Sequence, residues 1–346
     1  MNRRIPAWAV VAAGVMVSAG LMASVASADE LPVTKDSQGS YAPPKTPWGD
    51  PDIHGMWPVA HLQGTPFQRA KKYGDRMYLT PEEFAEQDKR QKAFADRYNK
   101  EIKNNKIGMG HWAKIGEATH RTSLLIWPRD GQLPAMTTLG KERSAKMRSS
   151  YQDINWDSPA DFDSWDRCIT RGMPASMFPF MYNNGIQVIQ APGYVVIKLE
   201  MIHEARIIPL DGRPALPTKI LQWMGVSRGH WDGNTLVITT TNLQPGPSML
   251  NVGTIGSRSR NNMPVSKHMK IVERLKPTGP NTIDYRITVS DPEDYQGTWT
   301  ADLPWVRDQS YKMFEYACHE DNSMIRHYIT SDRAKRAQEA KNNDKK

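Results

Sequence analysis

The feature that most constrains the fold is a series of short β-prone segments separated by turn residues in the C-terminal half of the chain. The segment Tyr194–Met201 has apolar residues at every second position, and Thr235–Thr241 consists of threonine, leucine, valine and isoleucine. Both compositions favour strands. Asp-Gly pairs at 211–212 and 232–233 follow or precede such segments, and Asp-Gly is a typical hairpin turn. We therefore expect neighbouring strands to pair antiparallel.

The expected strands extend over a β domain at 185–331, in which helix signals are nearly absent. Strands at hairpin spacing are typical of antiparallel barrels and sandwiches. The predicted fold is therefore mainly β, as a lipocalin-like barrel or a sandwich. The strands are expected at Ile186–Ile189, Tyr194–Met201, Arg206–Leu210, Thr235–Thr241, Met269–Leu275, Thr282–Ser290, Thr298–Leu303 and Lys312–Ala317.

The first 28 residues have the layout of a secretory signal peptide. Arg3 and Arg4 precede an apolar run, and Ala26-Ser27-Ala28 forms an A-x-A cleavage site. A twin-arginine signal and an uncleaved anchor are the alternatives, but the apolar run is interrupted and small residues precede the cleavage point. No later segment approaches the roughly 20 apolar residues of a membrane helix. We expect a periplasmic or secreted protein that does not span the membrane after cleavage at 28.

Charge and motif content argue against two classes of function. The chain has 45 Lys and Arg against 37 Asp and Glu, and loss of the signal peptide leaves a net charge of +6. Much of this excess lies in the polar tail 332–346, so no nucleic-acid-binding surface is expected. No glycine-rich phosphate loop opens a helix and no C-x-x-C-H haem motif occurs, so no cofactor is expected.

Cys168 and Cys318 are the two cysteines of the chain. In an exported protein an isolated pair is most simply a disulfide. Metal ligation and a redox role are the alternatives, and His319 beside Cys318 is the one hint of a ligand. Neither cysteine belongs to a C-x-x-C motif, so the disulfide is favoured.

The region 29–184 is expected to pack on the β domain as an extended strap followed by helical and irregular segments. The run 41–57 is too rich in proline and glycine for a helix or a central strand. It is interpreted as a strap anchored by Trp48 and Trp57, with a lid over a pocket as the alternative. Thr80–Lys103 begins with a capping box and is expected to be a surface helix. A second, short helix is expected within Thr138–Ser149.

Two loops also raise functional alternatives. The acidic stretch 153–166 could form a calcium loop, but it lacks the glycine and terminal glutamate of the familiar pattern, so a solvated loop is favoured. The long polar segment Gly246–Asn262 could be a flap over an opening. The calcium loop would use Asp157, Asp161, Asp163 and Asp166.

Several motifs, in order, resemble a widespread family of exported, largely uncharacterised bacterial proteins. They are TPWGDPDIHGMW, LTPEE, RIIPLDGRP, SRGHWDGNTLVITTTN, VERLKPTGPNTIDYRITVSDPEDYQGTWTADLPW and FEYACHEDN. This resemblance covers most of the mature chain and implies no established reaction. The part from Gly225 to Trp305 is also similar in strand pattern to lipocalin-like barrels, which implies a cavity for a small apolar ligand.

The candidate catalytic residues are His203, Glu204 and Arg206. If the strand from Tyr194 continues regularly, His203 ends a row of apolar side chains. A histidine beside a carboxylate and a guanidinium could act as a general base, with Arg206 holding developing negative charge. The alternative is a structural cluster in which Arg206 pairs with Glu200 or Glu204.

Further binding candidates are His230 and Trp231, which precede an Asp-Gly turn on opposite faces, and His319 and Glu320 beside the second cysteine. The histidines at 203, 230 and 319 could form a metal triad, but no short metal-binding spacing supports it. The G-x-S-x-G match at 225–229 precedes a hairpin rather than a strand–turn–helix elbow, so a serine nucleophile is not expected. The apolar run Met177–Tyr182 suits core or a pocket wall.

These observations favour a periplasmic protein with an apolar pocket for a hydrophobic small molecule. If it is an enzyme, cofactor-free acid–base chemistry fits best, such as hydrolysis, dehydration or isomerisation. A non-catalytic carrier and a structural envelope protein are the alternatives.

Overall fold

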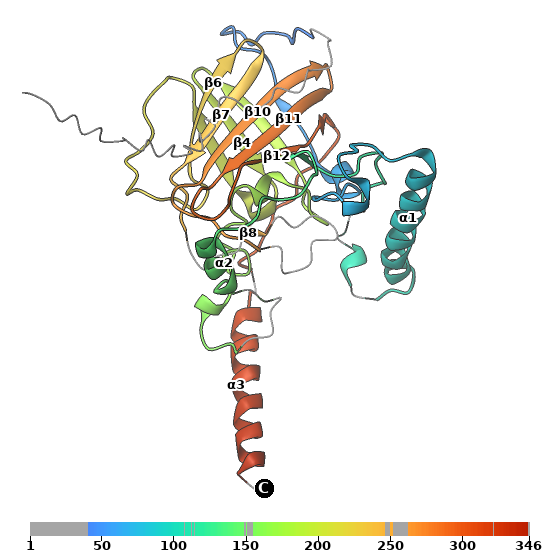
Figure 1. Cartoon of the computed structure of the whole chain (residues 1–346), viewed down its shortest axis with the longest axis vertical. Coiled ribbons are helices and arrows are strands. Elements are labelled where there is room, and N and C mark those ends of the chain that lie inside the picture. Colours follow the sequence, from blue (N-terminus) through green and yellow to red (C-terminus); the bar gives the residue numbers. More distant parts are fainter. Residues whose placement is uncertain are drawn as a thin grey trace, which may run out of the picture. The chain divides into compact units, whose positions relative to one another are not determined.

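The described part of the chain contains thirteen strands, and its three α-helices lie outside the sheets (Figure 1). The computed structural model describes residues 41–344 except 107, 112, 114, 149, 151–154, 246–249, 252–261 and 321. The predicted signal peptide, 1–28, and most of the predicted flap at 246–262 lie outside the described residues. Among the residues described, no helix is both long and apolar enough to cross a membrane.

The smaller sheet has the strand order β1-β3-β4-β5, and every neighbouring pair is antiparallel. The first of these strands comes from the predicted strap, so the strap is part of the sheet. The strands are β1 (Gly55–Met56), β3 (Ile186–Ala191), β4 (Tyr194–Leu199) and β5 (Ala205–Pro209).

The larger sheet has the order β2-β12-β11-β10-β7-β6, and β13 pairs with one end of β11. Its pairs are also antiparallel, and the short strands β8 (Leu250–Asn251) and β9 (Asn262–Met263) pair separately. The strands are β2 (Leu125–Trp127), β6 (Val226–Asp232), β7 (Thr235–Thr241), β10 (Lys270–Gly279), β11 (Thr282–Ser290), β12 (Trp299–Asp302) and β13 (Trp305–Val306).

The two sheets pack face to face around one hydrophobic core. Val195 and Ile197 of β4 are fully buried, and they belong to the same core cluster as Ile238 of β7 and Ile271 of β10. This alternation is what the sequence pattern of β4 predicts, because successive side chains point to opposite faces of a strand. The predicted mainly β fold is confirmed as a sandwich, and the described strands do not close into a barrel.

Two expected strands differ from the structure. The strand from Tyr194 ends at Leu199, because a turn follows in which Ile202 and His203 have φ values of 60° and 44°. The prediction of a strand at Lys312–Ala317 is wrong, since that segment contains no strand.

The buried carboxylate of Glu200 explains the second difference. It accepts hydrogen bonds from the Tyr311 hydroxyl at 2.6 Å and from the Phe314 backbone N–H at 2.9 Å. The same carboxylate accepts the Gly185 N–H at 2.8 Å. The Glu200 carboxylate therefore accepts the hydrogen bond that the Phe314 N–H would otherwise donate to a neighbouring strand. The segment crosses the end of the smaller sheet as an irregular chain.

The three described α-helices are α1 (Pro81–Lys103), α2 (Thr138–Ala145) and α3 (Met324–Asn343). The predicted capping box at the start of α1 is present, with the Glu83 N–H donating to Thr80 Oγ1 at 3.3 Å and the Thr80 N–H to the Glu83 carboxylate at 2.9 Å. Short 3₁₀ turns lie at Ala60–Gln63, Lys71–Tyr73, Met109–His111, Pro159–Asp161, Ala175–Met177 and Met201–His203.

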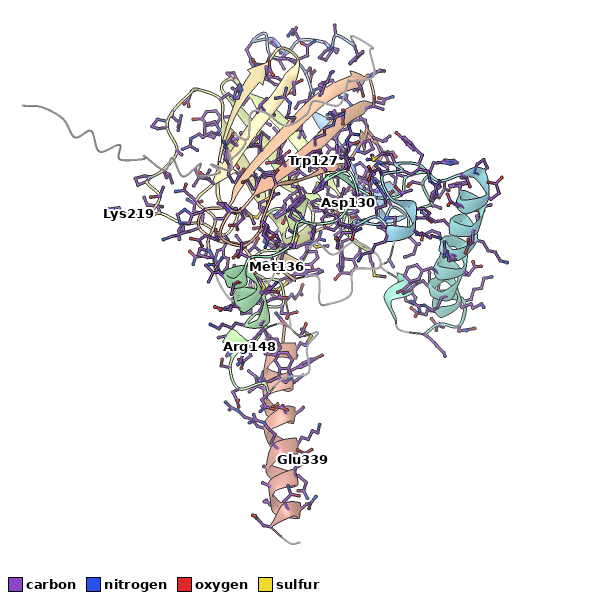
Figure 2. All side chains as sticks on the ribbon, viewed as in Figure 1. Trp127, Asp130, Met136, Arg148, Lys219 and Glu339 are labelled. Atoms are coloured by element: carbon purple, nitrogen blue, oxygen red, sulfur yellow. A yellow bond between two sulfur atoms is a disulfide. The ribbon has the colours of Figure 1, made fainter. Side chains whose placement is uncertain are left out.

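Residues 332–343 of the predicted polar tail belong to the helix α3, which the acidic loop holds between Tyr328 and Arg336. The Tyr328 ring lies 5.6 Å from that of Trp156, and Arg336 donates to Asp157 at 2.6 Å. Arg148, which lies just after α2 (Figure 2), pairs with Asp161 of the same loop. The loop therefore joins two helices to the body of the protein.

Candidate functional site

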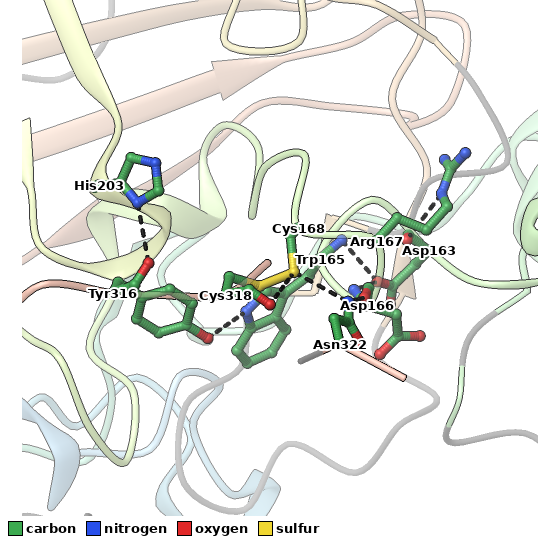
Figure 3. The surroundings of a disulfide bond; sticks show 9 residues. All are labelled: Asp163, Trp165, Asp166, Arg167, Cys168, His203, Tyr316, Cys318 and Asn322. Carbon is green, nitrogen blue, oxygen red and sulfur yellow. Dashed lines mark hydrogen bonds between the residues drawn. A yellow bond between two sulfur atoms is a disulfide. The ribbon is translucent and has the colours of Figure 1, made fainter. Parts of the chain in front are cut away.

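The predicted disulfide between Cys168 and Cys318 is present and holds the irregular segment after β13 (Figure 3). Asn322 donates to the Cys168 sulfur at 3.2 Å, and the Trp165 indole donates to the Tyr316 hydroxyl at 3.4 Å. Trp165 also belongs to a second, smaller apolar cluster. The bond and this cluster fix the chain beside the three candidate catalytic residues.

His203, Glu204 and Arg206 do not converge on one point. His203 is exposed, and its Nδ1 lies 3.0 Å from the backbone oxygen of Tyr316 (Figure 3). Because β4 ends at Leu199, the row of apolar side chains that His203 was expected to complete is interrupted by a turn. The histidine therefore ties two segments together at the surface.

Arg206 points inward, between the two sheets, and forms a buried ion pair with Glu273 of β10. Its terminal nitrogens lie 2.8 and 2.5 Å from the two carboxylate oxygens, and one also donates to Ser227 and Thr240 at 3.2 Å each. The Tyr285 hydroxyl donates to Glu273 at 2.7 Å. Both terminal nitrogens therefore have partners inside the fold, and the expected pairing with Glu200 or Glu204 is not formed.

Glu204 turns toward the loop that follows the first cysteine. The Thr170 hydroxyl donates to its carboxylate at 2.8 Å. Burial raises the pKa of Glu204 to about 7, although the Thr170 hydrogen bond and the charge of Arg206 act in the opposite direction. A carboxyl group with a pKa in this range can exchange a proton near neutral pH.

The predicted binding residues are dispersed. His230 is exposed, whereas its neighbour Trp231 is half-buried against the core, so the two point to opposite faces of β6 as expected. His319 and Glu320 are exposed in the turn after Cys318. The described residues contain no group of three or more His, Cys, Asp or Glu side chains able to hold a metal ion, so the described histidines do not form the alternative triad.

The carboxylates of the proposed calcium loop bind their own backbone. Asp161 accepts the N–H groups of Asp157 and Ser158, each at 2.8 Å. Asp163 accepts those of Trp165 and Asp166 at the same distance, and burial raises its pKa to about 7. These contacts make the stretch a structural loop.

A groove of about 260 Å³ lies between the strap and the turn that joins β10 to β11. Its lining includes the apolar residues Ile53, Trp57, Pro280 and Ile283, of which Ile53, Trp57 and Ile283 are almost fully buried beneath it. Its polar groups include Arg307, whose guanidinium lies over the Trp57 ring at 4.7 Å. The groove therefore combines an aromatic and aliphatic surface with a cation.

The strap shapes this groove because one of its two tryptophans is a true anchor. Trp57 is buried, donates its indole N–H to Ile53 O at 3.1 Å, and packs on Trp305 with ring centroids 6.4 Å apart. Trp48, the other expected anchor, is 39 % exposed. The proline-rich run thus provides a wall of the groove.

None of the residues nominated from the sequence as catalytic or binding lines this groove. Two sequence signals do point to it, namely Trp57 in the proline-rich run and the Pro280-Asn281 turn. Comparison of the chain with known protein families, with curated proteins and with solved structures finds no match.

Proposed function

We propose that this is an exported, periplasmic protein that binds a small molecule with a hydrophobic body in the groove between the strap and the β10–β11 turn. The observation that carries the proposal is the groove itself, in which Trp57, Ile53 and Ile283 meet Arg307. Small-molecule sites typically combine apolar and aromatic walls with few polar groups. A carrier role fits better than catalysis, because His203, Glu204 and Arg206 point in three directions.

Native mass spectrometry of the mature protein purified from the periplasm tests the proposal. We expect a chain that begins at Asp29 and carries a co-purifying apolar molecule. The variant Asn281→Trp adds a bulky ring at the groove wall and should lose that molecule. Asn234→Trp, at the β6–β7 turn and away from the groove, is the matched control and should retain it. Retention in Asn281→Trp, or the absence of any bound molecule in the parent, would contradict the proposal and favour a structural envelope role.

Acid–base catalysis remains the second candidate, because Glu204 has a pKa raised to about 7 and a hydroxyl partner. Incubation of the co-purified molecule with the protein tests it. If the molecule is converted, Glu204→Gln should abolish turnover without loss of binding, whereas substitution of the exposed Glu315 by Gln should have no effect. Turnover that survives Glu204→Gln would remove Glu204 as the catalytic group.

A further inference from the structure

The polar end of the groove is formed by Arg307, a half-buried side chain that follows β13. Its Nε is buried and has no hydrogen-bond partner. Among the described residues, the interaction found for its side chain is with Trp57, whose ring centroid lies 4.7 Å from Arg307 Cζ. A half-buried guanidinium is thus held in the groove without an acceptor from the described part of the fold.

The stack fixes how those donors can be used. A guanidinium held over an aromatic ring carries its N–H groups in the plane of a rigid fork. A carboxylate matches this fork with two parallel hydrogen bonds, which are short and strong because both partners are charged. Water or a lone carbonyl cannot pair with both sides of the fork in this way.

The acidic residue of the groove does not neutralise Arg307. Asp52 accepts the backbone N–H of His54 at 3.0 Å through the same oxygen that contacts the His54 ring. That contact lies within the strap itself. The described walls of the groove therefore leave Arg307 as a cation without a carboxylate partner.

Gly55 allows the arginine to lie against the strap. A Cβ at this position would lie 2.9 Å from Gln309 Nε2 and 3.6 Å from Arg307 Cζ, and the residue has a φ of +141°. An L side chain would therefore strain the backbone and displace the end of the Gln309 side chain, while its contact with the guanidinium would be an ordinary van der Waals one. The strap can therefore approach Arg307 closely at this glycine.

We propose that the groove is specific for small molecules that carry a carboxylate on a flat apolar body, with the carboxylate on Arg307 and the body against Ile53, Pro280 and Ile283. This inference rests on the proposed function and adds the ligand class to it. Affinity then has two separable parts: an apolar part that a neutral analogue shares, and a charged part that needs the guanidinium.

Calorimetric titration of the ligand-free mature protein with 3-phenylpropanoate and with its neutral amide separates these parts. We expect the acid to bind at least about tenfold more tightly than the amide. Arg307→Gln should remove this difference, and Arg307→Lys, which keeps the charge but not the fork, should retain part of it. The control Arg213→Gln alters an exposed arginine that pairs with Asp211 elsewhere and should leave both affinities unchanged.

The possible outcomes distinguish the two proposals. Equal binding of acid and amide, or a preference that survives Arg307→Gln in a folded protein, overturns the carboxylate inference. If the amide binds and Asn281→Trp abolishes that binding, small-molecule binding in the groove is supported even where the carboxylate inference fails. If neither compound binds, and the protein purified from the periplasm carries no molecule, both proposals fall. Circular dichroism of each variant establishes that it is folded.

Discussion

Arg206 is buried and Arg307 is half-buried, and their surroundings differ. Arg206 has two carboxylate oxygens and two hydroxyls around its terminal nitrogens, whereas Arg307 has an indole ring and no oxygen partner among the described residues. Nε lacks a partner in both, so the contrast lies in the terminal nitrogens. Burial alone therefore does not identify a binding arginine. An arginine whose terminal N–H groups already donate to protein acceptors has a structural role. An arginine whose terminal N–H groups lack such acceptors is available to a ligand.

The largest expected effect comes from removing the partner of the satisfied arginine. Glu273→Ala leaves Arg206 buried without its counter-charge and should destabilise the protein by about 3–5 kcal/mol. Urea unfolding followed by circular dichroism measures the loss. The double variant Arg206→Met/Glu273→Leu removes both charges and should recover most of the stability. A loss below about 1 kcal/mol for Glu273→Ala would mean that Arg206 finds other partners, and the contrast with Arg307 would disappear.

Gly55→Ala perturbs the other arginine through the backbone. The added Cβ would lie 2.9 Å from Gln309 Nε2 and in ordinary van der Waals contact with Arg307, and the residue is strained at its φ of +141°. We therefore expect a loss of about 1–3 kcal/mol, together with weaker carboxylate binding because the strap and Gln309 must shift beside Arg307. Gly193→Ala is the control, since Gly193 also has a positive φ, 76°, but nothing lies within 4 Å of its Cβ position. Unchanged carboxylate binding in Gly55→Ala would show that the position of the Arg307 guanidinium does not depend on its contact with the strap.

The pH dependence of stability tests whether the charge of Arg206 is fully engaged. Glu204 lies near Arg206, yet its folded pKa is about 7, above the ordinary value of 4.5. The folded state therefore binds this proton more tightly than the unfolded state, and stability should rise as pH falls from about 8 to about 5, by at most about 1.4 kcal/mol per unit of pKa difference. Asp163, also with a pKa of about 7, acts with the same sign.

Urea unfolding at a series of pH values measures this slope, and Glu204→Gln should reduce it while leaving the contribution of Asp163. An identical slope in Glu204→Gln would mean that Glu204 titrates normally. Arg206 would then be shared between two carboxylates instead of being engaged by Glu273.

The smallest expected effect on stability is that of Arg307→Gln. Because the guanidinium has only a partly exposed stacking contact, we expect a change within about 1 kcal/mol. Thermal unfolding of the ligand-free protein measures it. A loss comparable to that of Glu273→Ala would show that Arg307 is structural after all.

The sequence predicted those parts of the fold that depend on local chemistry. The alternation in β4 and the capping box of α1 follow from residue type and spacing. The pairing of Cys168 with Cys318 is not local, and it was predictable because these are the two cysteines of the chain. The strand β6 was not among the expected strands, since Gly229 interrupts its pattern. That glycine is required by packing, because a Cβ there would lie 2.7 Å from Leu210 and 2.9 Å from Ile208.

The candidate site could not be predicted in the same way, because its contacts join distant parts of the chain. The sequence places His203, Glu204 and Arg206 close together, but the backbone turns after Leu199 and their side chains point in different directions. Arg206 meets Glu273, 67 residues away. Arg307 follows a strand of the larger sheet and contacts Trp57, which follows a strand of the smaller sheet. No residue near either one in the sequence predicts this contact.

The disulfide determines what happens when the chain is cut by a protease. The bond joins residues 150 positions apart, and every strand from β3 to β13 lies within the covalent loop that it closes. A protease that cuts once anywhere in this loop leaves a single molecule of unchanged mass apart from one added water, and the two pieces part only when a reductant opens the bond. A nick that reaches an exposed turn of the sandwich therefore does not release a fragment while the surroundings stay oxidising.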